Sequence, residues 1–357
     1  MPGIRRAVSP GRRKGAVRGR TDRRAARQNA PVTTDIGSAR PLAQVLSDRM
    51  VVLDGGLSTE LERAGHDLSG ELWSALLLND APEAVVAAHL AFFEAGAEVA
   101  TTASYQASFD GFAAAGFDRD QAAMLLRRSV LLAREASVRA GRGGQSWVAA
   151  SIGPFGATLA RGEEYTGSYL DPDWAGRTGG GLSVEELRAF HRPRLEVLAE
   201  AGPDVLACET LPATAEVEAL VAEVQALGVP AWISLTTVTG GDGIVRTRRG
   251  EDAGQAFALT RGVDEIIAVG VNCTDPLGVG AAVTVAAQAS GKPVVVYPNS
   301  GESWDAMARS WLGESDFTDE DVAAWAARGA RLVGGCCRVG PEQVAAIRRA
   351  VDAVPCS

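Results

Sequence analysis

Cysteine and histidine are both scarce in this chain, with five cysteines and three histidines in 357 residues. The cysteines are odd in number and the chain is long, which excludes a small secreted protein built on a framework of disulfides. No uninterrupted apolar run is long enough to span a membrane, and the basic N-terminal residues lack the apolar segment of a secretory signal. We therefore expect a cytoplasmic protein with reduced thiols and no membrane partner.

Basic residues are concentrated at the N-terminus. Residues 1–28 carry ten Arg or Lys against one acid, Asp22, so this segment has a charge of +9 and the remaining residues −18, giving the net charge of −9. A basic segment could bind nucleic acid or an anionic surface, but this one has almost no apolar content, which is typical of disorder. We predict a disordered Arg-rich extension over residues 1–45. The acidic remainder argues against a nucleic-acid partner.

From about residue 50 the sequence alternates between short apolar runs and longer amphipathic ones. The amphipathic runs have apolar residues at helical spacing, and they include 82–96, 120–137, 183–202 and 213–228. One of them opens on Ser183 followed by Glu186, a helix N-terminal capping pattern. The short runs have the length and β-branched content of buried strands and number eight, at 50–56, 97–105, 146–153, 203–210, 230–237, 265–273, 292–299 and 331–337.

Strands that are buried on both faces and separated by helices form parallel sheets. Eight of them in about 300 residues favour a closed (β/α)₈ TIM barrel of the α/β class. An open, doubly wound sheet is the alternative, but no Gly-x-Gly-x-x-Gly turn follows any strand. We predict one catalytic barrel domain over residues 46–357, with its chemistry at the C-terminal ends of the strands. The longer loops at 154–182 and 238–252 are expected to cover a substrate there.

Three of the five cysteines fall at predicted strand ends. Cys273 ends the sixth strand, and Cys336 and Cys337 end the eighth. Any one of them alone is readily explained as a small buried hydrophobe. Three thiolates on one face, however, offer three corners of a tetrahedron, which is the pattern of a catalytic zinc site with one open position.

The remaining cysteines and the histidines are not expected to be ligands. Strand alternation turns Cys208 away from the neighbouring Glu209 and into the barrel wall. His66 falls in a predicted loop, and His89 and His191 fall within helical patterns, so we expect surface or capping histidines.

A zinc ion held by thiolates is suited to binding an incoming thiol and holding it as a thiolate nucleophile. Asp54 and Glu209, also at strand ends, would bind an ammonium group. The turn after Asp54 offers backbone N–H groups and hydroxyls for a carboxylate. The full set of predicted substrate-binding residues is Asp54, Gly55, Gly56, Ser58, Thr59, Ser104, Tyr105, Glu209 and Asn272. Thiol, ammonium and carboxylate together describe a small thiol amino acid.

From about residue 50 to 352 the chain resembles the homocysteine S-methyltransferases. The resemblance is carried by DGGLSTELERAG, LWSALLL, TTASYQAS, FHRPRLEVL, LACETLP, GVNC, VVYPNSGE and GGCCR. It implies a (β/α)₈ barrel with Zn²⁺ held by Cys273, Cys336 and Cys337, and homocysteine held by Asp54 and Glu209. Within the family, the chain is most similar to the enzymes that use S-methylmethionine or S-adenosylmethionine.

The activity implied by the resemblance is zinc-dependent methyl transfer from a sulfonium donor, with S-methylmethionine preferred, to the thiolate of homocysteine, giving methionine. Small molecules are the expected partners, and the chain is expected to be a monomer or a small homo-oligomer. The donor's positive sulfur should lie near aromatic faces. Loop position makes Trp73, Tyr105, Phe155 and Tyr165 candidates for that contact.

Other readings of the same residues remain. The site could take selenocysteine as acceptor, or the chain could be a non-catalytic zinc or thiol redox sensor that uses Cys336 and Cys337. A sensor, however, has no need of the amino-acid binding site predicted at Asp54 and Glu209. A barrel lyase or aldolase is disfavoured because no predicted strand ends in a lysine suited to Schiff-base chemistry.

Overall fold

A computed structural model describes residues 39–68, 72, 74–176, 180–305, 310–312 and 318–354. Within these residues the eight predicted strands are all present and form one parallel sheet, in the order β1-β12-β9-β8-β5-β4-β3-β2. Their bounds are β1 Val51–Val52, β2 Val99–Thr101, β3 Trp147–Ile152, β4 Val205–Leu211, β5 Ala231–Leu235, β8 Ile266–Asn272, β9 Val294–Tyr297 and β12 Ala330–Val333. The predicted barrel is confirmed.

The barrel closes where β1 meets β2. Leu53 and Val99 form a parallel bridge, and the Asp54 N–H donates to the Val99 carbonyl at 3.1 Å. Asp54 also accepts from Thr101 of β2, through the backbone N–H at 2.6 Å and the hydroxyl at 2.9 Å. The closing seam therefore includes a side chain predicted to bind substrate.

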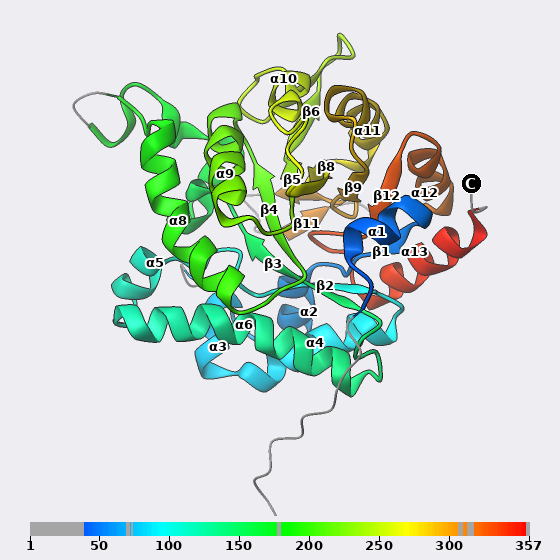
Figure 1. Cartoon of the computed structure of the whole chain (residues 1–357), viewed down its shortest axis with the longest axis horizontal. Helices are drawn as coiled ribbons and strands as arrows, with labels where there is room; N and C mark the ends of the chain where they lie inside the picture. The colour runs from blue at the N-terminus through cyan, green and yellow to red at the C-terminus, as the bar shows by residue number, and fades with distance from the viewer. Residues whose placement is uncertain are drawn as a thin grey trace, which may run out of the picture. The chain divides into compact units, whose positions relative to one another are not determined.

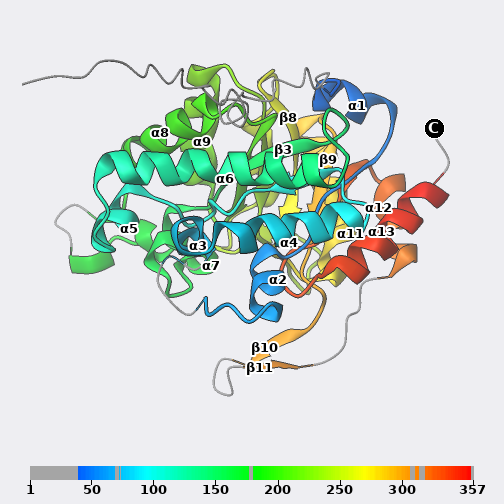
Figure 2. The same ribbon diagram turned by 90° about the horizontal axis from the view of Figure 1, so that it is seen from below.

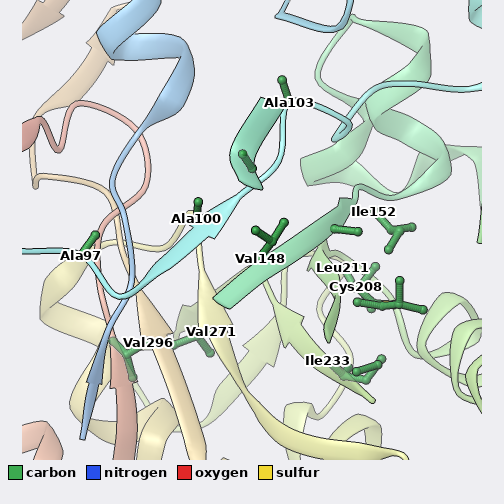
Figure 3. Packing of buried hydrophobic residues seen from close by; sticks show 14 of the residues in the cluster. Ala97, Ala100, Ala103, Val148, Ile152, Cys208, Leu211, Ile233, Val271 and Val296 are labelled. Carbon is green, nitrogen blue, oxygen red and sulfur yellow. The ribbon is translucent and has the colours of Figure 1, made fainter. Parts of the chain in front are cut away.

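Alternate residues of the strands enter two separate apolar layers. Val205 and Ala207 of β4 face the barrel interior with Trp232 of β5, whereas Leu206 and Cys208 belong to the layer between the strands and the helices. Figure 3 shows part of this outer layer, including Cys208. Cys208 is fully buried there, as the alternation predicted.

Helices surround the strands (Figure 1). The predicted amphipathic runs form α4 (Pro82–Glu94), α6 (Arg119–Arg139), α8 (Val184–Glu200) and α9 (Thr214–Leu227). Ser183 caps α8 with the predicted partner Glu186. The other helices are α2 Leu57–Arg63, α3 Ser74–Asp80, α5 Phe109–Ala114, α10 Ala253–Ala258, α11 Pro276–Ser290, α12 Asp319–Ala327 and α13 Pro341–Ala353.

One further helix, α1 (Leu42–Asp48), closes the N-terminal end of the barrel. Its Leu42, Val45 and Leu46 are buried against the interior layer. Figure 2 shows α1 on the opposite side of the barrel from α2. Apolar side chains from residue 42 onward thus already pack against the barrel, a few residues before the predicted domain start at residue 46. Residues 1–38, the bulk of the predicted extension, lie outside the described residues.

Insertions lie on the C-terminal side of the sheet. The segment after β3 contains η1 (Phe155–Leu159), α7 (Glu163–Thr166), η2 (Ser168–Leu170) and η3 (Trp174–Gly176). The segment after β5 contains the hairpin of β6 (Thr237–Thr239) and β7 (Val245–Thr247), and β10 (Ser303–Asp305) pairs with β11 (Ser310–Leu312) after β9. Across the described part of the chain, no helix has the length and apolar character needed to cross a membrane.

Candidate active site

Three thiols converge at the C-terminal ends of β8 and β12. The sulfur of Cys273 lies 2.7 Å from that of Cys336, which lies 4.0 Å from that of Cys337. All three sulfur atoms are within 4.8 Å of one another. The two strands are separated in the sheet only by β9, so the fold brings together the cysteines that are 63 residues apart.

The glycines before the cysteine pair allow the chain to pass close to β1. A Cβ atom on Gly334 would lie 2.5 Å from the Cβ of Leu53. The Gly335 N–H donates to the Asp54 carbonyl at 3.0 Å, and the Cys336 N–H donates to the Pro298 carbonyl at 2.7 Å. These contacts leave no room for a larger side chain at residue 334, and they fix the backbone from which both thiols project.

The donor set fits a metal ion. Hydrogen bonds from Cys273 and Cys336 lower the pKa of Cys337 well below its usual range, whereas hydrogen bonding to Cys273 and Cys337 raises the pKa of Cys336. Without a metal ion, the cluster therefore favours a single thiolate, with the other cysteines protonated. A bound cation would be needed to stabilise three thiolates. Three thiolate ligands with a fourth position open to a substrate suit a soft, tetrahedral cation.

Two carboxyl groups are buried near the thiols. Asp54 follows β1 and is 3% exposed, and Glu209 of β4 is 6% exposed. Burial raises the pKa of Asp54 to about 8, with a further contribution from the charge of Glu209, and burial raises the pKa of Glu209 to about 7. Glu209 accepts a hydrogen bond from the Ser151 hydroxyl and is also bonded to Tyr297. Neither carboxyl has a cationic side chain among its hydrogen-bond partners in the described structure, so a bound ammonium group would stabilise both.

The substrate-free protein is expected to lose stability as the pH rises from about 5 to 8. In the fold the pKa values of Asp54 and Glu209 are about 8 and about 7, against ordinary values of 3.8 and 4.5. The folded state therefore holds protons in this range that the unfolded chain has released, and the free energy of unfolding falls with rising pH. Thermal melting of wild type and Glu209→Gln across this range measures the effect. The variant should show a shallower fall, and equal slopes for both proteins would contradict the assignment.

The DGG turn packs against the cysteine loop. A Cβ on Gly56 would lie 2.5 Å from the Cys336 carbonyl oxygen, and the Gly56 N–H already donates to Val339. The Thr59 hydroxyl accepts from the Arg338 N–H at 3.0 Å. Gly55 is equally close to Val339, and Ser58 lies beside Thr59 in the first turn of α2. The predicted donor at Gly56 thus has a partner in the protein, which favours a role in shaping the site, whereas the Thr59 hydroxyl is used here as an acceptor.

The strand-end residues Ser104 and Asn272 are similarly engaged. The Ser104 hydroxyl donates to the Ser151 carbonyl at 2.7 Å. The Asn272 amide accepts from the Thr210 N–H at 2.7 Å and donates to the Thr210 hydroxyl at 2.7 Å. Thr210 has φ +60°, a left-handed conformation that a threonine adopts at a cost. Asn272 therefore holds the backbone beside Glu209.

Tyr105 lies nearer the thiols. Burial raises the pKa of its phenol, as do the charges of Cys273 and Glu164, and its hydroxyl is hydrogen-bonded to Thr210. Its ring packs on Gly153, where a Cβ would lie 2.7 Å away. Among the other aromatic candidates, the charge of Cys273 and burial raise the pKa of the Tyr165 phenol.

Phe155 does not face the thiols. Its ring packs on Phe190 and Tyr169, with centroids 4.9 and 5.3 Å away, and so belongs to the core of the insertion after β3. Trp73 lies outside the described residues. The sequence reasoning missed Glu164 and Tyr297. Tyr297 lies near the end of the predicted strand 292–299, which could have indicated it, whereas Glu164 lies in an insertion without a periodic pattern.

The insertion after β3 is anchored by a buried polar network on α8 and α9. Glu216 accepts from the Phe155 N–H at 2.7 Å, contacts His191 Nε2 at 2.7 Å and is hydrogen-bonded to the Tyr169 hydroxyl. Arg194 lies 2.7 Å from His191 Nδ1 and donates to it. Burial and the charge of Arg194 lower the pKa of His191 to about 4, so the ring is neutral and positions the loop.

The prediction of surface or capping histidines is thus wrong for His191, and it is wrong for His89 as well. Both side chains are fully buried. Burial lowers the pKa of His89 to about 4, and neither ring nitrogen has a hydrogen-bond partner in the described structure. His89 packs as part of α4, whose helical pattern alone did not indicate which face is covered.

The fold is a (β/α)₈ barrel, and three thiols and two buried carboxyl groups lie at the carboxyl ends of its strands. This arrangement is typical of an enzyme active site with a potential metal centre. Comparison with known proteins gives the family. The family model for homocysteine S-methyltransferase matches residues 51–351. The chain belongs to the homocysteine S-methyltransferase family, whose members are methyltransferases.

Individual relatives cover most of the chain. Homocysteine S-methyltransferase 4 of Zea mays is 42% identical over 316 residues, which cover 84% of this chain and 89% of the relative. A selenocysteine methyltransferase of Astragalus bisulcatus is 37% identical over 322 residues, covering 84% and 91%. The crystal structure of the metallated homocysteine methyltransferase MmuM of Escherichia coli matches with a TM-score of 0.73 and 38% identity, covering 87% of this chain and 99% of that one.

Proposed function

We propose that the protein transfers a methyl group from a sulfonium donor, preferably S-methylmethionine or otherwise S-adenosylmethionine, to the sulfur of homocysteine, giving methionine. The observation that carries the proposal is the convergence of three thiols with two buried carboxyl groups that lack a cationic side-chain partner. Membership in the homocysteine S-methyltransferase family supports the same reaction.

The buried carboxyl groups would hold the amino-acid end of the substrate. Asp54 is fixed by its two hydrogen bonds from Thr101, and Glu209 by those to Ser151 and Tyr297. An ammonium group bound between them would favour their ionised forms. Bound in this way, the substrate would direct its sulfur toward Cys273, Cys336 and Cys337.

We propose Zn²⁺ as the ion of the cysteine cluster, with Cys273, Cys336 and Cys337 as its ligands. When bound, it supplies a Lewis acid that lowers the pKa of the substrate thiol. The ligands must stay reduced and deprotonated for binding, which is the reason to place the protein in the reducing cytoplasm.

The chemistry itself needs no general acid. A new carbon–sulfur bond forms between the homocysteine thiolate and the donor's methyl carbon as the old bond breaks. The bonding pair returns to the donor sulfur, which leaves as a neutral thioether. Opposite charges disappear in this step, so a site that excludes water favours it. The burial of Asp54, Glu209 and Cys273 supports such a site. With S-methylmethionine as donor, both products are methionine.

Selenocysteine is a second candidate acceptor, because a relative with 37% identity is named a selenocysteine methyltransferase. The deciding experiment gives the reduced, zinc-loaded full chain either homocysteine or selenocysteine, with S-methylmethionine or S-adenosylmethionine, and measures the methylated product. Methionine formation with at least one donor is expected. Zinc binding without any methylated product would leave the redox-sensor alternative and overturn the proposal. Size-exclusion chromatography with light scattering would test the expected monomer or small homo-oligomer.

A further inference from the structure

A cavity of about 600 Å³ lies between the insertion after β3 and the hairpin segment after β5. Tyr165, Ser168 and Asp171 line it from the first segment, and Val238, Arg248 and Arg249 line it from the second. Neither the three thiols nor the two buried carboxyl groups are part of this lining. The cavity is therefore additional to the site proposed for homocysteine.

The two adjacent arginines of this cavity have different roles. Arg249 pairs with Asp171 at 2.8 Å and donates to the Gly167 carbonyl at 2.7 Å, so it holds the insertion after β3 in place. Arg248 is exposed, and its guanidinium carbon lies 5.3 Å from the centroid of the Tyr165 ring. In the described structure its guanidinium has no hydrogen-bond or ion-pair partner. It is free to bind an anion that enters the cavity.

Tyr165 connects this cavity with the thiol cluster. One face of its ring contacts Arg248, and it lines the cavity. Its phenol is close enough to the thiols for the charges of Cys273 and Cys337 to raise its pKa. A molecule in the cavity can thus lie against Tyr165 with one end directed to the thiols and the other to Arg248.

Glu164 directly precedes the cavity residue Tyr165 on α7 and carries a carboxyl group. Glu164 is 5% exposed, and its Oε2 atom has no hydrogen-bond partner in the described structure. Burial raises the pKa of this carboxyl, and the charges of Glu163 and Cys337 contribute. A buried carboxylate oxygen without a hydrogen bond is costly, and a cationic ligand beside Oε2 would offset that cost.

We propose that this cavity binds the methyl donor, with Arg248 holding the donor's α-carboxylate and Glu164 facing its sulfonium. A sulfonium amino acid has its positive sulfur at one end and its α-carboxylate, beside the α-ammonium, at the other, so Arg248 matches the carboxylate and Glu164 matches the sulfonium. Arginine binds carboxylates through paired hydrogen bonds and remains charged at any working pH. This inference rests on the proposed function and adds the residues that select the donor.

Steady-state kinetics of the reduced, zinc-loaded full chain tests the assignment of Arg248. With homocysteine saturating, Arg248→Met should raise the KM for the donor about 10- to 100-fold, the range for losing a hydrogen bond to a charged group. The KM for homocysteine should stay within about twofold. Arg248→Lys should recover part of the affinity. Arg246→Met is the matched control, since Arg246 lies two residues away and pairs with Asp242 at 2.7 Å outside the cavity lining.

A modified donor makes the test specific for the carboxylate. The carboxyl methyl ester of the donor should be used poorly by wild type, whereas Arg248→Met should accept acid and ester about equally. An unchanged donor KM in Arg248→Met, or a full preference for the acid in that variant, would overturn the assignment while leaving the methyltransferase activity intact. Failure of wild type to methylate homocysteine with either donor would overturn the proposed function and this inference together.

Glu164→Gln gives an independent check on the residue proposed to face the sulfonium. The substitution keeps the size of the side chain and removes its charge. It should raise the KM of the sulfonium donor, again by about 10-fold or more, and leave the inhibition constant of the neutral thioether product nearly unchanged. If the variant bound donor and product more weakly by the same factor, Glu164 would have only a structural role in the loop. That result would overturn its proposed contact with the sulfonium.

Discussion

Replacing Cys336 by alanine is expected to abolish methyl transfer and metal binding together. The side chain lies between the other two thiols, with its sulfur 2.7 Å from Cys273 and 4.0 Å from Cys337. A metal ion supplies several kcal/mol of charge stabilisation to such a reaction, and each 1.36 kcal/mol is worth tenfold in rate. We therefore expect a loss of about 1000-fold or more in turnover, measured beside the zinc content of the purified variant. Cys273→Ala and Cys337→Ala should behave in the same way.

Cys208→Ala is the matched control for these variants. Cys208 is as fully buried as the barrel core, but it belongs to the layer between the strands and the helices. Its removal should leave both the zinc content and the turnover within about twofold of wild type, with at most a modest loss of stability. A variant of Cys336 that keeps its metal and its activity would show that the cluster is not the catalytic centre.

The second large effect is expected from Glu209→Gln, which should lower kcat/KM for homocysteine by about 100- to 1000-fold. The substitution preserves shape and removes the charge proposed to hold the substrate ammonium. Breaking a buried charge pair costs about 3–5 kcal/mol. We expect a loss below the upper end of that range, because Asp54 would still bind the substrate ammonium in the variant. Kinetics with each substrate varied in turn would show the loss for homocysteine, with the donor KM and the zinc content unchanged.

Glu223→Gln separates this effect from general destabilisation. Glu223 is also buried, but it pairs with Arg188 at 2.7 Å and Arg192 at 2.8 Å between α8 and α9. Its variant should melt at a lower temperature and keep its affinity for homocysteine. Equal kinetic losses in both variants would argue that Glu209 acts only through the stability of the barrel.

The barrel could be predicted because its signal is repeated along the chain. Eight apolar runs alternate with amphipathic helices, and strand order then follows from the parallel topology. The meeting of Cys273 with Cys336 and Cys337 was predictable for the same reason, since strand ends in a closed barrel share one face. Both predictions depend on periodicity and topology alone.

The residues that position the site through hydrogen bonds could not be predicted from periodicity and topology. Asn272 and Thr59 are engaged by backbone groups of residues distant in sequence, and those hydrogen bonds become visible only once the loops are placed. Glu164 lies on a helix of four residues within an insertion that has no periodic pattern. His191 was missed because a helical pattern does not reveal that Glu216 and Arg194 meet it inside the protein.

Asp54 has two tasks that act on the same pair of oxygen atoms. Its carboxylate joins β1 to β2 through Thr101, and the same carboxylate is proposed to receive the substrate. A substitution of Asp54 would therefore alter both the stability of the barrel closure and the choice of ligand. Glu209 lies on β4 and has no part in the junction of β1 with β2. Substitutions at Glu209 that change the ligand should therefore cost the barrel less stability than substitutions at Asp54.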